Sequence, residues 1–446
     1  MKLETEGLEL LGKALIHLEK GFADLPDMPL DFDGEKLTDA LMEVAEAMRD
    51  NYPYFHPLYA GQMIKPPHPV ARLAYMLALY VNPNNHALDG GRASSHMEKE
   101  AVAEIARMFG WETHLGHLTG GGTMANMEAL WVSGSLHPGK LIVASEQAHY
   151  THGRISHVMK LPFHAIETDN RARMDLNHLE DLLKEGNVGT VVATIGTTAT
   201  GSVDPLPEIL SLKEKYGFRI HADAAYGGYY ILAENLPEET KRAFQHLHEV
   251  DSIAIDPHKH GLQPYGCGCI VFRDPGVGRL YKHDSPYTYF SSKELHLGEI
   301  SLECSRPGAS AVALWATQRM LPLIRGGTFA RSLERCREAG LRLYEKLSED
   351  PRFVVSFPPE LDIVIWAPRR ERISEASEAA SEFFEAAAER DLHLALATLP
   401  SRFFEDSLQD TARDSETVTC LRSCLMKPEH LDWVERIYEI ISDLAS

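Results

Sequence analysis

The stretch SIAIDPHKHG, residues 252–261, joins a short apolar segment to a lysine. The segment 252–255 has the length and the apolar side chains of a buried β-strand, and Pro257 ends it. A lysine at the end of a core strand loses contact with water, which lowers the pKa of its amine. An amine with a lowered pKa attacks an aldehyde more readily, so Lys259 is a candidate nucleophile.

A second strand end, RIHADAAYGG at residues 219–228, places the carboxylate of Asp223 among small residues. On its own, an aspartate at such a position is typical of a turn cap. Beside a pyridine ring, the same carboxylate keeps the ring nitrogen protonated, because opposite charges about 4 Å apart attract by about 4 kcal/mol at an effective dielectric of about 20. A lysine and an aspartate at two such strand ends together indicate pyridoxal 5'-phosphate as the cofactor.

A glycine-rich segment, LTGGGTMANMEAL at residues 118–130, precedes a helical pattern. The N–H groups at a helix N-terminus bind a phosphate, and glycines let the backbone approach it closely. Gly122 and Thr123 are therefore candidate phosphate ligands. The segment matches neither a Walker A loop nor G-x-G-x-x-G, and glycines before a helix are also typical of a simple tight turn.

Histidines are numerous in this chain, 22 in all. His149 follows an apolar, strand-like segment and is placed to stack its imidazole on the cofactor ring. Neither the group of His149, His152 and His157 nor the pair of His246 and His248 has the carboxylate or cysteine that would complete a metal site. We therefore expect no metal.

Apolar runs of strand length recur at residues 141–144, 190–195, 218–222, 252–255 and 269–272. They lack polar alternation, which is typical of strands buried on both faces of a mostly parallel sheet covered by helices. A helix is expected to begin at Ser95, where Ser95 and Glu98 have the spacing of a capping box, and to end at Gly110. The expected fold class is α/β, with the catalytic groups at strand ends.

Three parts are predicted along the chain. Residues 1–85 are interrupted by prolines and suggest an arm that lies on another surface. Residues 86–326 hold the predicted parallel sheet. Residues 327–446 predict a smaller α+β domain, with strands at 352–357, 362–367 and 417–426, a helix at 374–390 and a last helix that begins at Pro428.

The charge balance limits the possible partners. The 44 basic and 65 acidic residues give a net charge of −21, which argues against nucleic acid or an anionic membrane. Neither a secretory signal pattern nor an apolar run long enough to span a bilayer is seen, so a cytoplasmic protein is expected. The six cysteines match no disulfide or zinc framework and are expected to be reduced, buried and inert.

Five sequence blocks, taken together, resemble the group II pyridoxal-phosphate-dependent amino acid decarboxylases, which have the aspartate aminotransferase-like fold (fold type I). The likeness covers most of the chain and is clearest from Pro53 to about Gly327. The blocks are residues 121–126, 148–149, 196–198 with 204–205, 221–226, and 256–259.

The resemblance implies a role for each matching residue. Lys259 binds the cofactor covalently, Asp223 pairs with the ring nitrogen and His149 stacks on the ring. The resemblance also implies a homodimer with the active site at the interface and the arm wrapped around the partner. Further matching positions bind the phosphate or line the cofactor: Gly122, Thr123, Thr198, Ala225 and His258.

In the family, a tyrosine on a loop after the lysine strand delivers a proton to Cα. Here the loop comprises residues 281–292 and is shorter than in the aromatic decarboxylases. Tyr289 is the first candidate and Tyr287 the second. Phe290 can also be aligned with the tyrosine, and relatives with phenylalanine there convert the amino acid to an aldehyde with oxygen.

Decarboxylation of an aromatic amino acid is the leading hypothesis, because the segment 52–69 is rich in aromatic side chains and is expected to line the substrate pocket. A glutamate- or aspartate-type substrate stays open, with Arg92 and Arg306 as candidate ligands of a second carboxylate. A carbon–carbon lyase of the same fold, an aminotransferase and a catalytically silent binding paralogue are the remaining alternatives.

Overall fold

A seven-stranded sheet dominates the computed structural model, which describes residues 5–26, 33–282, 295–409 and 411–445. The strands occur in the order β1-β7-β6-β5-β4-β2-β3, and neighbours from β6 through β3 are parallel. β7 is antiparallel to both of its neighbours. The strands are β1 (Leu115–Thr119), β2 (Leu141–Ser145), β3 (Phe163–Ile166), β4 (Val188–Thr194), β5 (Arg219–Asp223), β6 (Ser252–Ile255) and β7 (Gly268–Phe272).

The predicted α/β class and the mostly parallel sheet are confirmed. Every residue of β4, β6 and β7 is buried, which explains their unbroken apolar sequences. β1 and β3 were not predicted. β1 contains Gly116 and His117, and β3 is an edge strand whose His164 and Ala165 are exposed.

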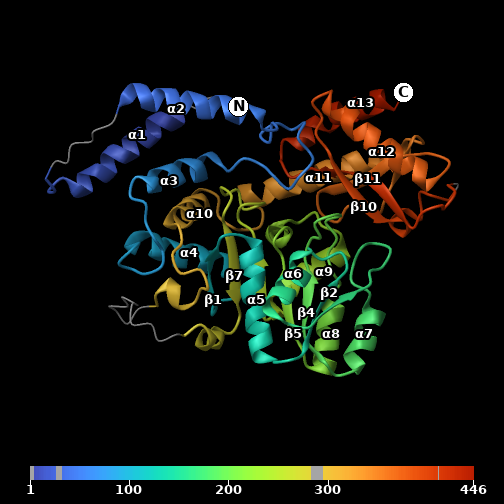
Figure 1. Ribbon diagram of the computed structural model, residues 1–446, viewed down its shortest axis with the longest axis horizontal. Helices are drawn as coiled ribbons and strands as arrows, with labels where there is room; N and C mark the ends of the chain where they lie inside the picture. The colour runs from blue at the N-terminus through green and yellow to red at the C-terminus, as the bar shows by residue number, and fades with distance from the viewer. Residues whose placement is uncertain (1–4, 27–32, 283–294, 410, 446) are drawn as a thin grey trace.

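Helices cover this sheet, as Figure 1 shows. One of them, α5, lies across the middle of the sheet and contacts β1, β4, β5, β6 and β7. Its N-terminus follows the glycines of the segment 118–130. The helices of this part are α4 (Arg92–Met108), α5 (Gly122–Leu136), α6 (Thr151–Met159), α7 (Leu176–Lys184), α8 (Leu206–Tyr216), α9 (Glu238–Gln245) and α10 (Gly308–Met320).

The predicted start of a helix at Ser95 is wrong. α4 begins at Arg92, and Ser95 and Glu98 are buried inside it. The capping-box spacing arose by chance within a helix, because Glu98 uses its carboxylate for buried contacts with Arg306, Asn85 and the backbone of Leu118.

A second, four-stranded antiparallel sheet has the order β10-β11-β9-β8. Its strand β10 was not predicted, and the last helix begins at His430 rather than at Pro428. The elements are α11 (Thr328–Glu349), β8 (Phe353–Val355), β9 (Ile363–Pro368), α12 (Ile373–Ala388), β10 (Ala395–Pro400), β11 (Thr417–Cys424) and α13 (His430–Leu444). In the sequence, the strands of the first sheet all come before residue 326 and those of the second sheet all come after it. The domain limits at 85 and 326 stay predictions.

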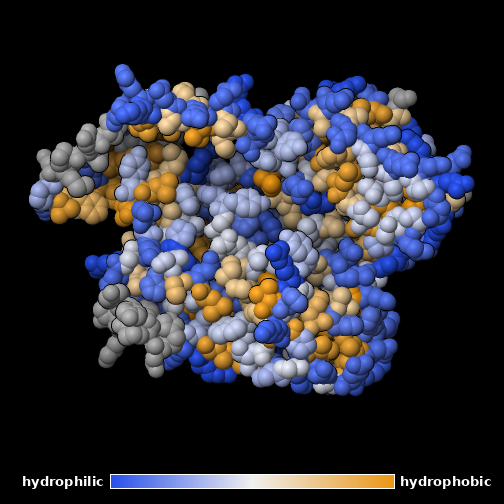
Figure 2. Space-filling model, viewed as in Figure 1, coloured by the Kyte–Doolittle hydropathy of each residue, from blue (hydrophilic) through white to orange (hydrophobic). Residues whose placement is uncertain are grey.

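The N-terminal part contains α1 (Thr5–Glu19), α2 (Gly34–Ala47) and α3 (Pro69–Leu79). The segment between α2 and α3 packs on the second sheet, where the N–H of Ala60 donates to the carbonyl of His393 and the N–H of Cys424 donates to that of Ala60. α1 and α2 extend along one side of the molecule and leave many apolar side chains exposed (Figures 1 and 2).

Short 3-10 helices connect several of these elements: η1 (Lys20–Phe22), η2 (Met48–Asp50), η3 (Gly228–Leu232), η4 (Leu247–Glu249), η5 (Pro275–Leu280), η6 (Leu297–Glu299) and η7 (Ser401–Phe404). Among the described residues, no helix combines the length and the apolar character needed to cross a membrane. The cysteines are buried as expected, except Cys304, which is exposed.

Candidate active site

A cavity of about 350 Å³ lies at the carboxyl ends of the parallel strands. The segments that follow β1, β2, β4, β5 and β6 all contribute to its wall, which is the usual position of a ligand site in such a sheet. The lining side chains and backbone belong to Gly120, Gly121, Gly122, Thr123, Met124, Asn126, His149, Thr151, Thr194, Gly196, Thr198, Asp223, Ala225, Tyr226, Asp256, His258, Lys259 and Tyr265.

Lys259 lies just beyond β6 with 18% of its side chain exposed, and its Nζ is 3.0 Å from Oδ2 of Asp256. Burial lowers the pKa of the lysine, but the negative charges of Asp256 and Asp223 outweigh burial and raise that pKa above its usual value. The expectation of a lowered pKa was therefore wrong. Of the two carboxylates that oppose burial, that of Asp256, three residues earlier, has the larger effect on the amine.

Asp223 ends β5 and is 5% exposed. Its Oδ2 accepts hydrogen bonds from Nε2 of His152 at 2.8 Å and from Nδ2 of Asn126 at 3.2 Å, and its Oδ1 accepts from the N–H of Ala225 at 3.2 Å. Burial would raise the pKa of the carboxyl, but the hydrogen bond from His152 and the positive charge of Lys259 hold it well below its usual range. Asp223 is thus a buried anion at the wall of the cavity.

A chain of hydrogen bonds continues behind Asp223. Oδ1 of Asn126 lies 2.8 Å from Nε2 of His221, and Nδ1 of His221 lies 2.9 Å from Oγ of Ser252. Burial lowers the pKa of His221 to about 3, so this imidazole is neutral. Nε2 of His221 donates to Asn126, which leaves the Asn126 amide N–H groups to donate to Asp223.

His149 follows β2, lines the cavity and is partly buried. Its Nδ1 forms a short hydrogen bond with the hydroxyl of Thr151, the first residue of α6. Burial lowers the pKa of its imidazole, so the ring is neutral at pH 7. A neutral, fixed ring at this wall is suited to stacking on a flat ligand.

The glycine segment forms a cradle at the N-terminus of α5. Gly121 has a φ of +150°, and no side chain caps the helix. A Cβ at Gly122 would lie 2.7 Å from Oδ2 of Asp256, so only glycine leaves this space open. The first N–H groups of a helix have no intrahelical acceptors and favour an anion. Gly122 and Thr123, the predicted phosphate ligands, are the first two residues of this helix.

The remaining predicted cofactor residues, Thr198, Ala225 and His258, also line the cavity. His258 is 8% exposed and its Nδ1 donates to the carbonyl of Cys267 at 2.9 Å. Its ring stacks on Tyr265, with 4.4 Å between ring centroids and an angle of 28°. Tyr289 and Tyr287, the candidate proton donors, lie outside the described residues.

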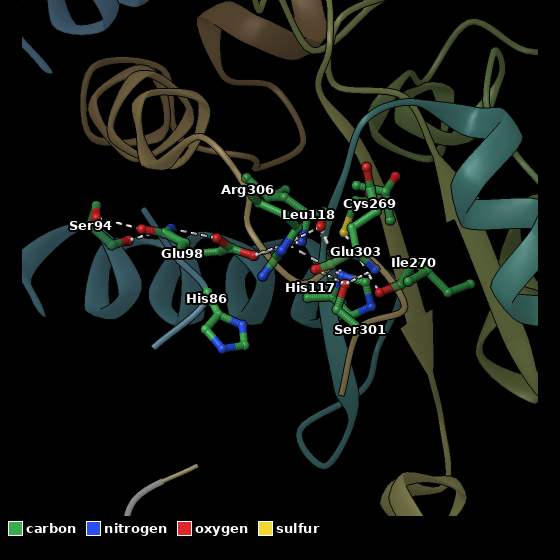
Figure 3. Close-up of polar contacts among 12 residues, drawn as sticks. His86, Ser94, Glu98, His117, Leu118, Cys269, Ile270, Ser301, Glu303 and Arg306 are labelled. Carbon is green, nitrogen blue, oxygen red and sulfur yellow. Dashed lines mark hydrogen bonds and ion pairs between the residues drawn. The ribbon is translucent and has the colours of Figure 1, made fainter. Parts of the chain in front are cut away.

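The two candidate arginines do not line the cavity. Arg306 is 6% exposed and forms an ion pair with Glu98, with 2.9 Å between Nη1 and Oε1. It also donates to the carbonyl of Leu118, and Figure 3 shows its side chain between these partners. Arg92 is exposed at the start of α4.

The arm segment 52–69 was expected to line the substrate pocket, but none of its residues is part of the cavity wall. It reaches the site indirectly, because the hydroxyl of Tyr265 donates to the carbonyl of Met63 at 3.5 Å. Tyr52, Tyr54 and Tyr59 instead pack on one another.

The polar residues of the site that the sequence did not predict include Asn126, His152, Asp256 and Tyr265. Asn126 and Asp256 lie inside the segments that drew attention, at positions that face the cavity, so their residue types were a usable signal. His152 was considered only as a metal ligand. The residues around Tyr265 in the sequence do not indicate a role at the site. The turn between β6 and β7 brings Tyr265 to Lys259 and His258.

The donor set fits pyridoxal phosphate. Lys259 supplies an amine for the aldehyde, Asp223 a buried anion for the ring nitrogen, and α5 an uncapped N-terminus for the phosphate. Within the described part of the chain, no group of three or more histidine, cysteine or acidic side chains is arranged to hold a metal ion.

Comparison with protein families matches residues 132–367 to the pyridoxal-dependent decarboxylase conserved domain. The chain is 28% identical over 409 residues to an L-tyrosine decarboxylase of Enterococcus faecium, which covers 67% of each protein. It is 30% identical over 310 residues to a probable L-tyrosine/L-aspartate decarboxylase of Methanopyrus kandleri, covering 68% of this chain and 80% of that one.

Among solved structures, Oryza sativa TDC with PLP and tryptamine has a TM-score of 0.78 to this chain, with 17% identity and complete coverage of both chains. At this identity the likeness concerns the fold. It agrees with the expected fold type I architecture.

Proposed function

The chain belongs to the pyridoxal-dependent decarboxylases, and from this premise we propose that its substrate is an aromatic L-amino acid, with L-tyrosine first. The enzyme is a pyridoxal-phosphate-dependent carboxy-lyase that acts on an amino acid. The products of the proposed reaction are the aromatic amine and carbon dioxide.

The choice of an aromatic substrate rests on which residues line the cavity. Of the lysines and arginines in the described residues, Lys259 alone lines the cavity, and it is the residue proposed to hold the cofactor. No cation of this part of the chain is then left for a second carboxylate. Tyr265 offers an aromatic surface beside Lys259, and Arg306 is engaged by Glu98.

We propose the following roles for the cofactor-binding residues. Lys259 holds the cofactor aldehyde, Asp223 places a negative charge at the ring nitrogen, and His149 covers one ring face. Gly122, Thr123 and the N-terminus of α5 hold the phosphate. Bound pyridoxal phosphate supplies the electron sink that accepts the electrons of the broken Cα–carboxylate bond.

Covalent attachment at Lys259 has a direct test. Borohydride reduction of the holoenzyme followed by peptide mass mapping should place the cofactor on Lys259. A label on any other lysine would contradict the proposed site.

L-aspartate is the second candidate substrate, because the Methanopyrus kandleri relative is named for both tyrosine and aspartate. Amine and carbon dioxide release should be assayed across the protein amino acids, with aldehyde, ammonia and hydrogen peroxide measured alongside. Tyramine from tyrosine supports the proposal. β-Alanine from aspartate, without any aromatic amine, would replace it, and peroxide with aldehyde would identify an oxygen-dependent aldehyde synthase.

Tyr289 is the proposed donor of the proton to Cα, with Tyr287 as the second candidate. We expect Tyr289→Phe to reduce amine formation severely and to leave the cofactor absorbance intact. Tyr287→Phe, from the same segment, tests the second candidate in the same assay. Unchanged turnover of Tyr289→Phe would remove Tyr289 from the mechanism.

We further propose a homodimer with the active site at its interface, in which α1 and α2 contact the partner. Leu8, Ile16, Leu41 and Val44 on these helices are about half exposed or more, which is unusual for a surface without a partner. A cytoplasmic protein without nucleic acid or membrane partners agrees with the net charge of −21. Sedimentation velocity should show a dimer that L41E/V44E weakens, whereas L396E on β10 should leave it unchanged.

A further inference from the structure

His152 lies behind Asp223, on the first turn of α6, and its side chain is almost completely buried. Its Nε2 is 2.8 Å from Oδ2 of Asp223, shorter than the 3.2 Å contacts from Asn126 and the backbone of Ala225. No step assigned above to a residue of the site uses this imidazole.

The other nitrogen of His152 decides which tautomer is present. Nδ1 is buried and has no hydrogen-bond partner among the described residues. A buried N–H without an acceptor is rarer in proteins than an acceptor without a donor, so the proton belongs on Nε2 and the lone pair on Nδ1. His152 is then a neutral donor that points its single N–H at the carboxylate.

A neutral donor and a cationic donor have different consequences for Asp223. A cation at His152 would compete with the protonated ring nitrogen for the same negative charge. A neutral N–H orients the carboxylate and leaves its full charge available. Asn126 also donates a neutral N–H, and the neutral His221 behind it adds no charge.

We propose that His152 is a positioning residue, which donates from Nε2 to Oδ2 of Asp223 and so keeps this carboxylate ionised and its Oδ1 directed at the ring nitrogen of the cofactor. The inference rests on the proposed pairing of Asp223 with that nitrogen. Oδ2 is engaged by two side-chain donors, whereas the one donor to Oδ1 within the described part of the chain is the backbone N–H of Ala225, so Oδ1 retains acceptor capacity.

A matched pair of variants separates this role from packing. Met and Gln are close in volume, but only Gln keeps an N–H donor. His157→Met is the control, because His157 lies on the same helix and is exposed. Equilibrium binding is measured with pyridoxal phosphate and with its analogue in which CH replaces the ring nitrogen.

We expect His152→Met to weaken pyridoxal phosphate binding on the order of tenfold, the value of one hydrogen bond to a charged group. Binding of the nitrogen-free analogue should change much less, because that ligand makes no use of the Asp223 charge. His152→Gln should restore most of the affinity, and His157→Met should bind both ligands like the unaltered protein.

Equal losses for both ligands, or no loss for either, would overturn the role of His152. If the unaltered protein itself binds both ligands equally, the pairing of Asp223 with the ring nitrogen is wrong, and this inference fails with it. That result is distinct from a failure of the proposed decarboxylation, which the product assay tests separately.

A second measurement covers the case in which His152→Met does not fold. With histidine labelled by ¹⁵N, the imidazole signals that the unaltered holoenzyme loses in His152→Gln should be those of a ring with a protonated Nε2 and a bare Nδ1. A doubly protonated imidazole at this position would overturn the neutral-donor role.

Discussion

At the scale of single residues, the chemistry of the site depends on pairs of charges that are distant from water. Lys259 illustrates this, because burial and two carboxylates act on its amine in opposite directions and the carboxylates prevail. Asp256 is the nearer of the two, at 3.0 Å from Nζ. It therefore controls the pH at which the free amine becomes available to an aldehyde.

Asp256→Asn should lower the pKa of Lys259, because it removes the nearest negative charge that stabilises the ammonium form. Only the neutral amine attacks an aldehyde, so the pH of half-maximal attachment rate should fall by about one unit. The rate of covalent attachment of pyridoxal phosphate to the apoprotein, followed by absorbance against pH, measures this shift. Asp432→Asn, on the exposed surface of α13, is the control, and an upward shift in Asp256→Asn would refute the argument.

At the scale of elements, two helices position the site. α5 brings its uncapped N-terminus to the strand ends, and α4 supplies Glu98 to the buried ion pair with Arg306. Glu303, near Arg306 in the sequence, also contacts the glycine segment, since the N–H of Gly120 donates to Oε2 of Glu303 at 2.9 Å. The glycine segment is thus held by side chains far away in the sequence (Figure 3).

Gly122→Ala should weaken pyridoxal phosphate binding by about tenfold or more, because the new Cβ would lie 2.7 Å from Oδ2 and 3.1 Å from Oδ1 of Asp256. Either the carboxylate or the helix N-terminus must then move. Equilibrium dialysis with the cofactor measures the loss. Gly34→Ala is a suitable control, since no atom lies within 4 Å of its added Cβ, and equal affinity of both variants would show that the cradle tolerates a methyl group.

Glu98→Gln should cost about 3 kcal/mol of unfolding free energy, because it leaves the buried guanidinium of Arg306 without a counter-charge. Glu104→Gln on the same helix breaks an ion pair with Arg107 whose side chains are about half exposed, and it should cost less than about 1 kcal/mol. Urea unfolding of the two variants gives the comparison. Similar losses for both would mean that burial does not govern the strength of these pairs.

At the scale of the whole molecule, buried neutral histidines couple stability to pH. Burial lowers the pKa of both His221 and His430 to about 3. In the unfolded chain a histidine binds a proton below about pH 6.5, whereas these two do not bind one in the fold. Each therefore lowers the stability as the pH falls from about 6.5 towards 3. Asp204 acts in the opposite direction, since burial raises its pKa to about 7.

His430→Asn isolates one of these contributions. The amide oxygen is placed to accept the N–H of Lys427, as Nδ1 of His430 does at 3.1 Å, but it does not titrate. Below about pH 6.5, the unfolding free energy of the variant should depend on pH less steeply, by about 1.4 kcal/mol per unit. Urea unfolding at several pH values measures the slope. An identical slope in both proteins would show that His430 is protonated in the fold.

The sequence by itself determined the buried parallel strands, the α/β class and the residues at their carboxyl ends, because continuous apolar runs and strand-end polar groups are local patterns. Lys259 and Asp223 were found in this way. The edge strands β1 and β3 were not, since Gly116 and His117 interrupt the apolar sequence of β1, and β3 has exposed residues in its middle.

Only the tertiary structure decided how these groups influence one another. The raised pKa of Lys259, the contact of His152 with Asp223, the position of Tyr265 and the pairing of Arg306 with Glu98 all depend on which segments the fold brings together. Charge interactions and hydrogen bonds act over a few ångströms in space, and distance along the chain does not predict them.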